Sequence, residues 1–153
     1  MHLRFYEARS GKVYKELMED FNVSGITDSV ILYAERIPDD ELNFTNADRP
    51  IYCFHFDKEP IKPHGVPFKF ILKPGEEFKD TRERIGKRTG IKGKLLEKIK
   101  FAIVGRSLYS KPRYIEDNEV VMDISQDEED LLALDHQNRS RNFWNKGESI
   151  FIR

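Results

Sequence analysis

The sequence predicts an α+β fold, in which a β-hairpin precedes one amphipathic helix and further strands follow that helix. Two apolar stretches, residues 51–56 and 66–72, flank a segment rich in Pro and Gly, as paired strands do. Residues 78–90 then show helical spacing of apolar side chains. Two later apolar stretches, 99–104 and 131–134, have the length of strands rather than helices. Together these segments make a sheet with one principal helix.

The hairpin and the helix are the clearest elements. Residues 51–56 are apolar at nearly every position, so this strand is expected in the middle of a sheet, buried on both faces. Glu76 and Glu77 place negative charge before the helix, where the helix dipole is positive. Phe78 and Ile85 share one helical face, and Gly90 is a suitable C-terminal cap.

The remaining elements of this part follow in chain order. We expect a short helical stretch at Leu95 and Leu96, a strand at 99–104, a brief strand at Tyr114 and Ile115, a turn at 116–118 and a last strand at 131–134. The order of hairpin, helix, strand, short strand, turn and final strand is that of the β-grasp fold. This order predicts a β-grasp domain, which begins at the strand 51–56 and ends with the strand 131–134.

The first 48 residues contain too few elements to cover both faces of a small sheet. We expect a strand at residues 3–6, a helix and a second strand at 30–34, followed by a linker at 39–48. The helix is predicted from apolar side chains at intervals of three and four: Val13, Tyr14, Leu17, Met18 and Phe21. About the first 40 residues are accordingly predicted to be the tail end of a larger unit.

Composition excludes several classes of protein. The 153 residues include 26 Lys and Arg against 27 Asp and Glu, a formal net charge of −1, which does not favour nucleic acid or membrane surfaces as partners. No apolar run approaches the roughly 20 residues of a membrane span. Cys53 is the single cysteine, so no internal disulfide can form and an intracellular location is expected.

The last segment, residues 137–153, has a different character. It is mostly polar, yet it carries five large apolar side chains: Phe143, Trp144, Ile150, Phe151 and Ile152. Fully burying one such side chain is worth about 1.5 to 3 kcal/mol. One outcome is that these five residues bind a partner surface. The alternative is that Phe143 and Trp144 pack on the domain and the end frays.

Several short motifs resemble the C-terminal ubiquitin-like region of the herpesvirus-associated ubiquitin-specific proteases, a deubiquitinase family with fungal members. The motifs are His-Phe-Asp-Lys-Glu at 55–59, Gly-Val-Pro-Phe at 65–68, Glu-Lys-Ile-Lys-Phe-Ala-Ile-Val at 97–104, Leu-Ala-Leu-Asp-His at 132–136 and Arg-Ser-Arg at 139–141. They occur in the order of that family over residues 50–153.

The resemblance implies a regulatory role without chemistry of its own. Residues 49–136 would be the last ubiquitin-like domain of a thiol-dependent deubiquitinase, and 1–48 the second half of the preceding one. The Cys and His boxes of such enzymes lie far upstream of this region. Residues 137–153 would be an activating peptide that docks in cis on the catalytic domain. The resemblance implies the cytoplasm and nucleus as the location, and it requires no cofactor or metal.

Three alternatives remain open. The first is a scaffold that recruits substrates or adaptors through the β-grasp sheet or the acidic residues 127–130, with no role for the tail. The second is a thiol hydrolase built from Cys53 with Asp135 and His136, although a buried structural thiol is the more common role. The third is a metal site at His55 and His64, for which the sequence offers no complete ligand set at zinc-like spacing.

The basic residues near the helix favour no nucleic acid partner. Lys87, Arg88, Lys92, Lys94, Lys98 and Lys100 are interrupted by Glu97 and lack interleaved aromatic residues. The sequence therefore predicts a solvated face for all six.

Overall fold

The structure is a computed structural model of the chain and describes residues 2–17, 31–42, 45–106 and 111–138. In this part of the chain, no helix has the length and apolar character that crossing a membrane requires. The described elements form an α+β fold of two sheets and a few helices, as the sequence predicted.

The larger sheet has five strands. They are β4 (Arg49–Asp57), β5 (Glu59–Leu72), β6 (Lys100–Val104), β7 (Arg113–Tyr114) and β8 (Leu131–Asp135). Their order across the sheet is β5-β4-β8-β6-β7. β4 and β8 pair in parallel, with Cys53 opposite Leu132, and the other neighbours are antiparallel. β4 therefore lies inside the sheet, as its unbroken apolar sequence predicted.

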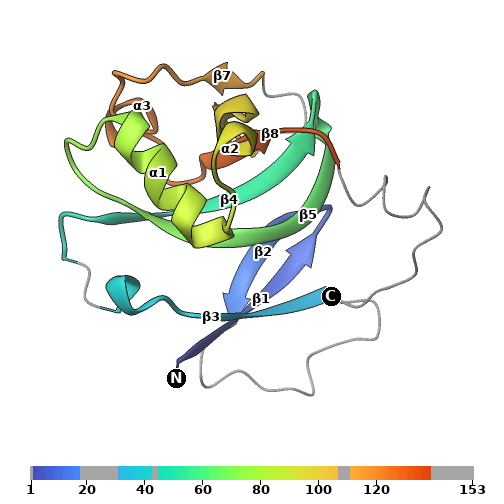
Figure 1. Ribbon diagram of the computed structural model, residues 1–153. Coiled ribbons are helices and arrows are strands. Elements are labelled where there is room, and N and C mark those ends of the chain that lie inside the picture. The colour runs from blue at the N-terminus through green and yellow to red at the C-terminus, as the bar shows by residue number, and fades with distance from the viewer. Residues whose placement is uncertain (1, 18–30, 43–44, 107–110, 139–153) are drawn as a thin grey trace.

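Three helices cover one face of this sheet (Figure 1). They are α1 (Phe78–Thr89), α2 (Lys94–Lys98) and α3 (Val121–Ile124). The predicted boundaries of α1 are confirmed, and Gly90 caps it in the left-handed conformation at φ 79°. Phe78 and Ile85 are at most 2% exposed and pack against the inward residues of β4, β6 and β8. The segment after the turn at 116–118 forms the short helix α3, for which the sequence had predicted no helix.

The smaller sheet has three strands, β1 (Leu3–Arg9), β2 (Lys12–Leu17) and β3 (Ile31–Arg36), in the order β2-β1-β3. A short 3₁₀ turn, η2 (Asp39–Glu41), follows it. β1 pairs antiparallel with both neighbours. The strands predicted at residues 3–6 and 30–34 are confirmed within a few residues.

The helix predicted from Val13, Tyr14 and Leu17 is wrong, because these residues belong to β2. Ser10 and Gly11 both have positive φ, 51° and 74°, the backbone of a tight hairpin turn that reverses the chain. β2 then pairs with β1 along its length. Long-range pairing thus overrides a local spacing that fitted a helix. Met18 and Phe21, the other two residues of that prediction, lie outside the described residues.

β5 begins earlier than predicted. The sequence placed the second hairpin strand at 66–72 and treated Pro60 and Pro63 as an interruption. In the structure β5 starts at Glu59 and includes both prolines. β5 is at the edge of the sheet, where a residue without a backbone N–H is tolerated.

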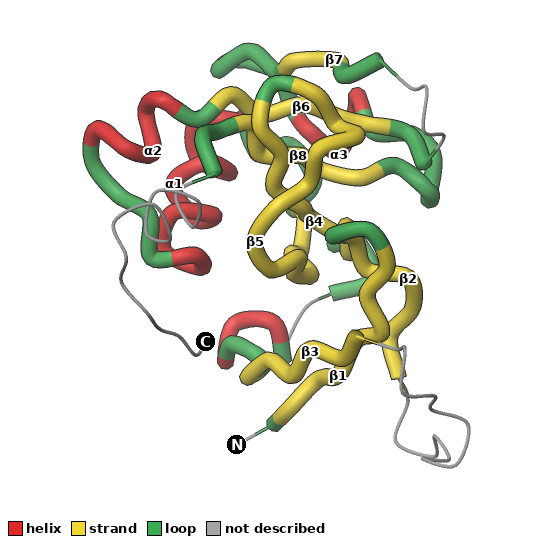
Figure 2. Tube along the Cα trace, turned by 90° about the vertical axis from the view of Figure 1, so that its right-hand side faces the viewer, coloured by secondary structure: helices red, strands yellow, loops and turns green. Residues whose placement is uncertain are grey.

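Among the described residues, the smaller sheet covers the face of the larger one opposite α1, α2 and α3, so these elements form three layers (Figures 1 and 2). The covered face is apolar, and its residues are at most 2% exposed: Phe54, Phe56, Ala102, Val104, Leu131 and Ala133. The Lys12 ammonium lies 4.6 Å from the Phe54 ring centroid. The Tyr6 and Tyr52 rings meet edge to face, with their centroids 6.2 Å apart.

Gly86 allows α1 to approach the segment that follows it. A Cβ at this position would lie 2.8 Å from the Ile91 carbonyl oxygen and 2.8 Å from Leu96 Cδ2. We expect Gly86→Ala to destabilise the chain by about 1 to 3 kcal/mol through overpacking, despite the better helix propensity of Ala. Lys87→Ala, at an exposed position of the same helix, should change stability by less than about 0.5 kcal/mol. Urea unfolding compares the two. A Gly86→Ala variant as stable as the parent would contradict this packing.

Candidate functional site

The candidate functional site is the end of the five-stranded sheet from which the chain leaves β8 toward the predicted tail. The tail residues Phe143, Trp144, Ile150, Phe151 and Ile152 lie outside the described residues. The structure does describe the first two residues of the predicted tail, Gln137 and Asn138, and His136 before them. We call residues 136–138 the tail base.

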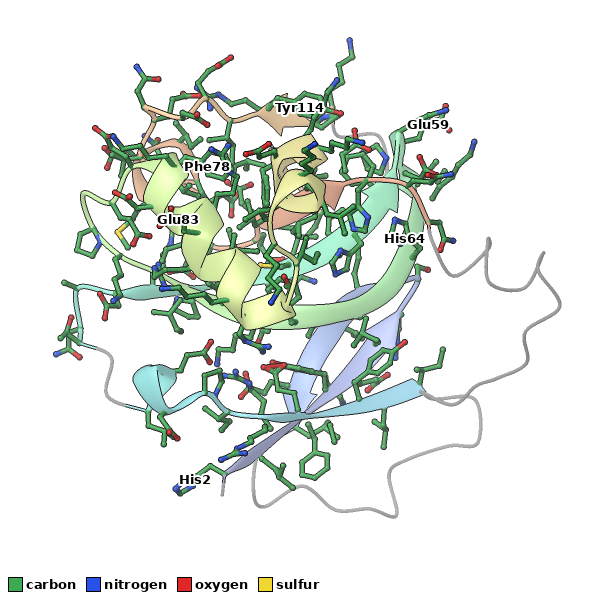
Figure 3. All side chains as sticks on the ribbon, in the orientation of Figure 1. His2, Glu59, His64, Phe78, Glu83 and Tyr114 are labelled. Atoms are coloured by element: carbon green, nitrogen blue, oxygen red, sulfur yellow. The ribbon has the colours of Figure 1, made fainter. Side chains whose placement is uncertain are left out.

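Three histidines meet at the tail base. His55 Nδ1 lies 2.8 Å from His136 Nε2, and His64 Nε2 lies 3.0 Å from the His136 carbonyl oxygen. The ring centroids are 5.9 Å apart for His55 and His64, 5.0 Å for His55 and His136, and 4.7 Å for His64 and His136. His64 lies beside the end of β8 (Figure 3). We call these three side chains the histidine cluster.

The sheet register explains how the cluster forms. His55 on β4 is the cross-strand partner of His64 on β5 and pairs with Leu134 on the other side. The His136 backbone N–H donates to the Phe56 carbonyl oxygen at 2.9 Å, just beyond the end of the β4–β8 ladder. Burial, together with the neighbouring His136 and His64, lowers the pKa of His55 to about 3. His55 is therefore neutral at physiological pH.

The histidine cluster brings together His55 and His64, the two residues considered for metal binding. Among the described residues, no group of three or more His, Cys, Asp or Glu side chains has an arrangement that could hold a metal ion. The short His55 to His136 distance has the geometry of a hydrogen bond between two imidazoles.

Cys53 lies in the core between the sheet and the helices. It is 1% exposed, and burial raises the pKa of its thiol well above the ordinary value. Its neighbour across the β4–β8 ladder is Leu132, whereas Asp135 and His136 lie at the end of β8. A thiol that is neutral and buried is a poor nucleophile, so the arrangement does not favour the thiol hydrolase alternative.

A second polar cluster joins the smaller sheet to α1. Arg4 Nη2 donates to Glu35 Oε1 at 2.8 Å and to Glu41 Oε2 at 2.6 Å. The Tyr6 hydroxyl donates to Glu35 Oε2 at 2.5 Å, and Arg88 forms ion pairs with Glu35 and Glu41. The Arg4 and Glu41 side chains are 5% and 7% exposed. We call these five residues the junction network.

Buried charges are stable only when groups of opposite charge pair with them. Here the guanidinium groups of Arg4 and Arg88 pair with the carboxylates of Glu35 and Glu41. Burial by itself lowers the pKa of Arg4, but its hydrogen bonds to Glu41 and Glu35 raise that pKa above its ordinary value. Burial and the Glu35 carboxylate raise the pKa of Tyr6. Arg4 therefore stays charged and Tyr6 stays neutral.

Sequence reasoning missed this network and assigned Arg88 to a solvated basic face. Five residues of that stretch, Lys87, Lys92, Lys94, Lys98 and Lys100, are exposed as predicted. Arg88 instead has a side chain that is only 19% exposed and pairs with Glu35. One signal was present, because Arg4 interrupts the otherwise apolar stretch 3–6.

Comparison with known proteins identifies the family of the chain. A family model described as "Ubiquitin-specific protease C-terminal" matches residues 1–141. The chain belongs to this family. The match includes every described strand and helix, from β1 to β8, together with the tail base. The resemblance seen in the short motifs is thereby confirmed.

Individual members of the ubiquitin-specific protease family are similar to this chain at moderate sequence identity. Ubiquitin carboxyl-terminal hydrolase 5 of Schizosaccharomyces pombe is 29% identical over 133 residues, which is 87% of this chain and 12% of the relative. Ubiquitin carboxyl-terminal hydrolase 15 of the same yeast is 28% identical over 137 residues, 88% of this chain and 12% of the relative. Ubiquitin C-terminal hydrolase 12 of Arabidopsis thaliana is 31% identical over 125 residues, which is 78% of this chain and 11% of the relative. The chain thus spans about one eighth of the length of the first two relatives.

The junction network of this ubiquitin-specific protease C-terminal region can be tested by removing Arg4. In Arg4→Met, Glu35 and Glu41 remain buried with Arg88 as their cationic partner, and we expect a loss of about 3 kcal/mol. Arg9→Met is the matched control, because Arg9 pairs with Glu7 while its side chain is 64% exposed, and it should cost less than about 1 kcal/mol. Chemical denaturation compares the variants. Equal losses at the two positions would contradict the role of the network.

Proposed function

We propose that the chain is the regulatory C-terminal module of a thiol-dependent deubiquitinase and performs no catalysis itself. Residues 49–136 form a β-grasp (ubiquitin-like) domain, and 1–48 are the C-terminal half of the preceding one with its linker. Residues 137–153 form a tail that docks on the catalytic domain of the same protein and favours its active arrangement. Deubiquitination by the parent protein is part of this proposal, as is a location in the cytoplasm and nucleus.

The strand order supports the β-grasp assignment. The first and last strands, β4 and β8, are parallel neighbours in the centre of the sheet. The hairpin partner β5 lies at one edge, and the antiparallel pair β6 and β7 at the other. One principal helix covers a single face. This order supports a β-grasp fold like that of ubiquitin, in which the parallel pair β4 and β8 is central, β5 adjoins β4, and β6 and β7 adjoin β8.

The smaller sheet repeats half of that arrangement. β1 pairs antiparallel with β2 and β3, as β6 pairs with β7 and β8. β3 thus corresponds to β8, and the edge of β3 that has no partner strand among the described residues corresponds to the edge at which β8 pairs with β4. The outward face carries the exposed apolar residues Leu3, Phe5 and Leu32. A preceding hairpin and helix in the parent protein would pair with β3 and cover this face.

The family match carries the proposed function. It extends from β1 past the end of β8 to residue 141, and the five apolar tail residues follow it directly, from Phe143 onward. The groove nearest the tail base, about 610 Å³, is lined largely by charged residues of the β4–β5 turn, among them Asp57, Lys58, Glu59 and Lys62. Such a lining does not suit apolar side chains, which supports docking elsewhere.

Tethering makes weak docking sufficient. Burial of Ile150, Phe151 and Ile152 would provide a few kcal/mol before the cost of ordering the peptide. A flexible tether gives an effective concentration on the order of millimolar, which populates a weak site within the same protein. A peptide that binds the competent arrangement more tightly than the idle one raises the competent fraction.

The scaffold alternative places the function elsewhere on the surface. The sheet face without helices, one of its two suggested binding surfaces, is covered by β1 and β2. The acidic turn at 127–130 is the other, and Glu129 there pairs with Arg106 at 2.8 Å. The test deletes residues 137–153 from the parent enzyme. If partners are still recovered in a pull-down and the kinetics of the enzyme are unchanged, the scaffold is favoured.

The proposal predicts the effect of shortening the tail isoleucines. In the full-length parent enzyme, Ile150→Ala combined with Ile152→Ala should lower turnover of ubiquitin conjugates roughly fivefold or more, the usual size of a coupling between sites. Ser149→Ala lies in the same tail and removes no apolar group, so turnover should be unchanged. Equal turnover in the double variant and the parent enzyme would refute activation by the tail.

A further inference from the structure

We propose that the histidine cluster is a clamp that fixes the position and direction in which the tail leaves the domain. This inference rests on the proposed function, because it gives the docking tail a defined origin. In this proposal His55 and His64 position the tail, a role that does not follow from the family match. The clamp joins the β4–β5 hairpin to the tail base.

His136 is held at three points beyond the last ladder pair of β8. Its backbone N–H donates to the Phe56 carbonyl oxygen at 2.9 Å. Its carbonyl oxygen accepts from His64 Nε2 at 3.0 Å, and its ring meets His55 Nδ1 at 2.8 Å. A strand end held by backbone pairing alone frays readily. Here the side chains of His55 on β4 and His64 on β5 contact His136, which lies just beyond the end of β8.

The residues on either side of His136 are held by the same hairpin. Before it, Asp135 Oδ1 accepts a hydrogen bond from the Lys58 backbone N–H at 2.8 Å. After it, the Asn138 backbone N–H donates to Asp57 Oδ2 at 3.4 Å. The tail therefore leaves along a path fixed by the tip of the β4–β5 hairpin. A defined origin raises the effective concentration of the tail at a site within its reach.

One assignment of protons satisfies three hydrogen bonds of the cluster with neutral rings. His64 Nε2–H donates to the His136 carbonyl, His55 Nδ1–H donates to His136 Nε2, and His136 Nδ1–H donates to the Gln137 carbonyl oxygen at 3.1 Å. A pair in which both His55 and His136 are protonated has no acceptor between them, so the ring contact is lost. The clamp is closed when the rings are neutral.

Acid should therefore open the clamp. The His55 pKa of about 3 in the closed state is below the ordinary value near 6.5, so the opened state binds more protons. Opening is favoured as the pH falls from about 6.5 toward 3. The charged and titratable groups around the cluster come from several elements: Asp57, Lys58, Glu59, Lys62, Arg88, Tyr114 and Asp135, with Glu35 from the smaller sheet.

Amide hydrogen exchange on the complete chain tests the clamp. In His64→Ala, protection at Asn138 and at His136 should fall about tenfold, the effect of one lost hydrogen bond, whereas Leu132 and Ala133 inside the ladder stay protected. His64→Gln, whose amide N–H can donate to the same carbonyl, should restore part of the protection. His2→Ala, an exposed histidine away from the cluster, is the control.

The unmodified chain provides a second measurement that does not depend on a variant. Between pH 7 and pH 5, protection at residues 136–138, corrected for intrinsic exchange, should fall roughly twentyfold if opening releases His55 to its ordinary pKa. Unchanged protection at the tail base in His64→Ala, or loss that spreads equally through β8, would overturn the clamp. Neither readout uses enzyme activity, so failure here is distinguishable from failure of the tail variants in the parent enzyme.

Discussion

The need to cover both faces of β4 and β8 organises this molecule. Residues that alternate along these strands are buried toward the helices on one side and toward the smaller sheet on the other. Helices α1 to α3 cover the first face, and the β1–β2 hairpin lies over the second. Since a few hundred square ångströms of exposed apolar surface is already unusual on a soluble chain, the five-stranded sheet depends on the three-stranded one. The two predicted units are therefore structurally coupled rather than connected only by a linker.

The junction network gives that coupling a preferred geometry. Hydrophobic contact alone is not directional, whereas Arg4 must meet Glu35 and Glu41 in a fixed arrangement for its buried charge to be compensated. Arg88 extends the same network to α1. A buried ionic cluster contributes little net stability compared with an apolar one, so we expect its main effect here to be orientation. If the parent enzyme uses the tail as proposed, this orientation and the clamp at His136 together set where the tail begins.

Most of the larger sheet could be predicted from the sequence, because the pattern of each element is visible in its own residues and their neighbours. The double-sided apolar run of β4, the amphipathic pattern of α1 and the Gly90 cap each depend on neighbouring residues. β2 could not be predicted in the same way, since Val13, Tyr14 and Leu17 fit a helical spacing and only pairing with β1 makes them a strand. The site was harder still. His55, His64 and His136 are up to 81 residues apart, and only the antiparallel register of β4 and β5 together with the parallel register of β4 and β8 brings them together. The five apolar tail residues remain a prediction.

Native-state hydrogen exchange of the complete chain in increasing urea tests most directly whether the three layers act as one body. If the smaller sheet is an integral cover of the larger one, the β1–β2 amides, such as that of Tyr6, should open with nearly the same free energy as the β4–β8 amides. Both sets should lose protection in one transition, to within about 1 kcal/mol, as cooperative units do. Early loss of protection in β1 and β2, while β4 and β8 stay protected at the same urea concentration, would contradict the account.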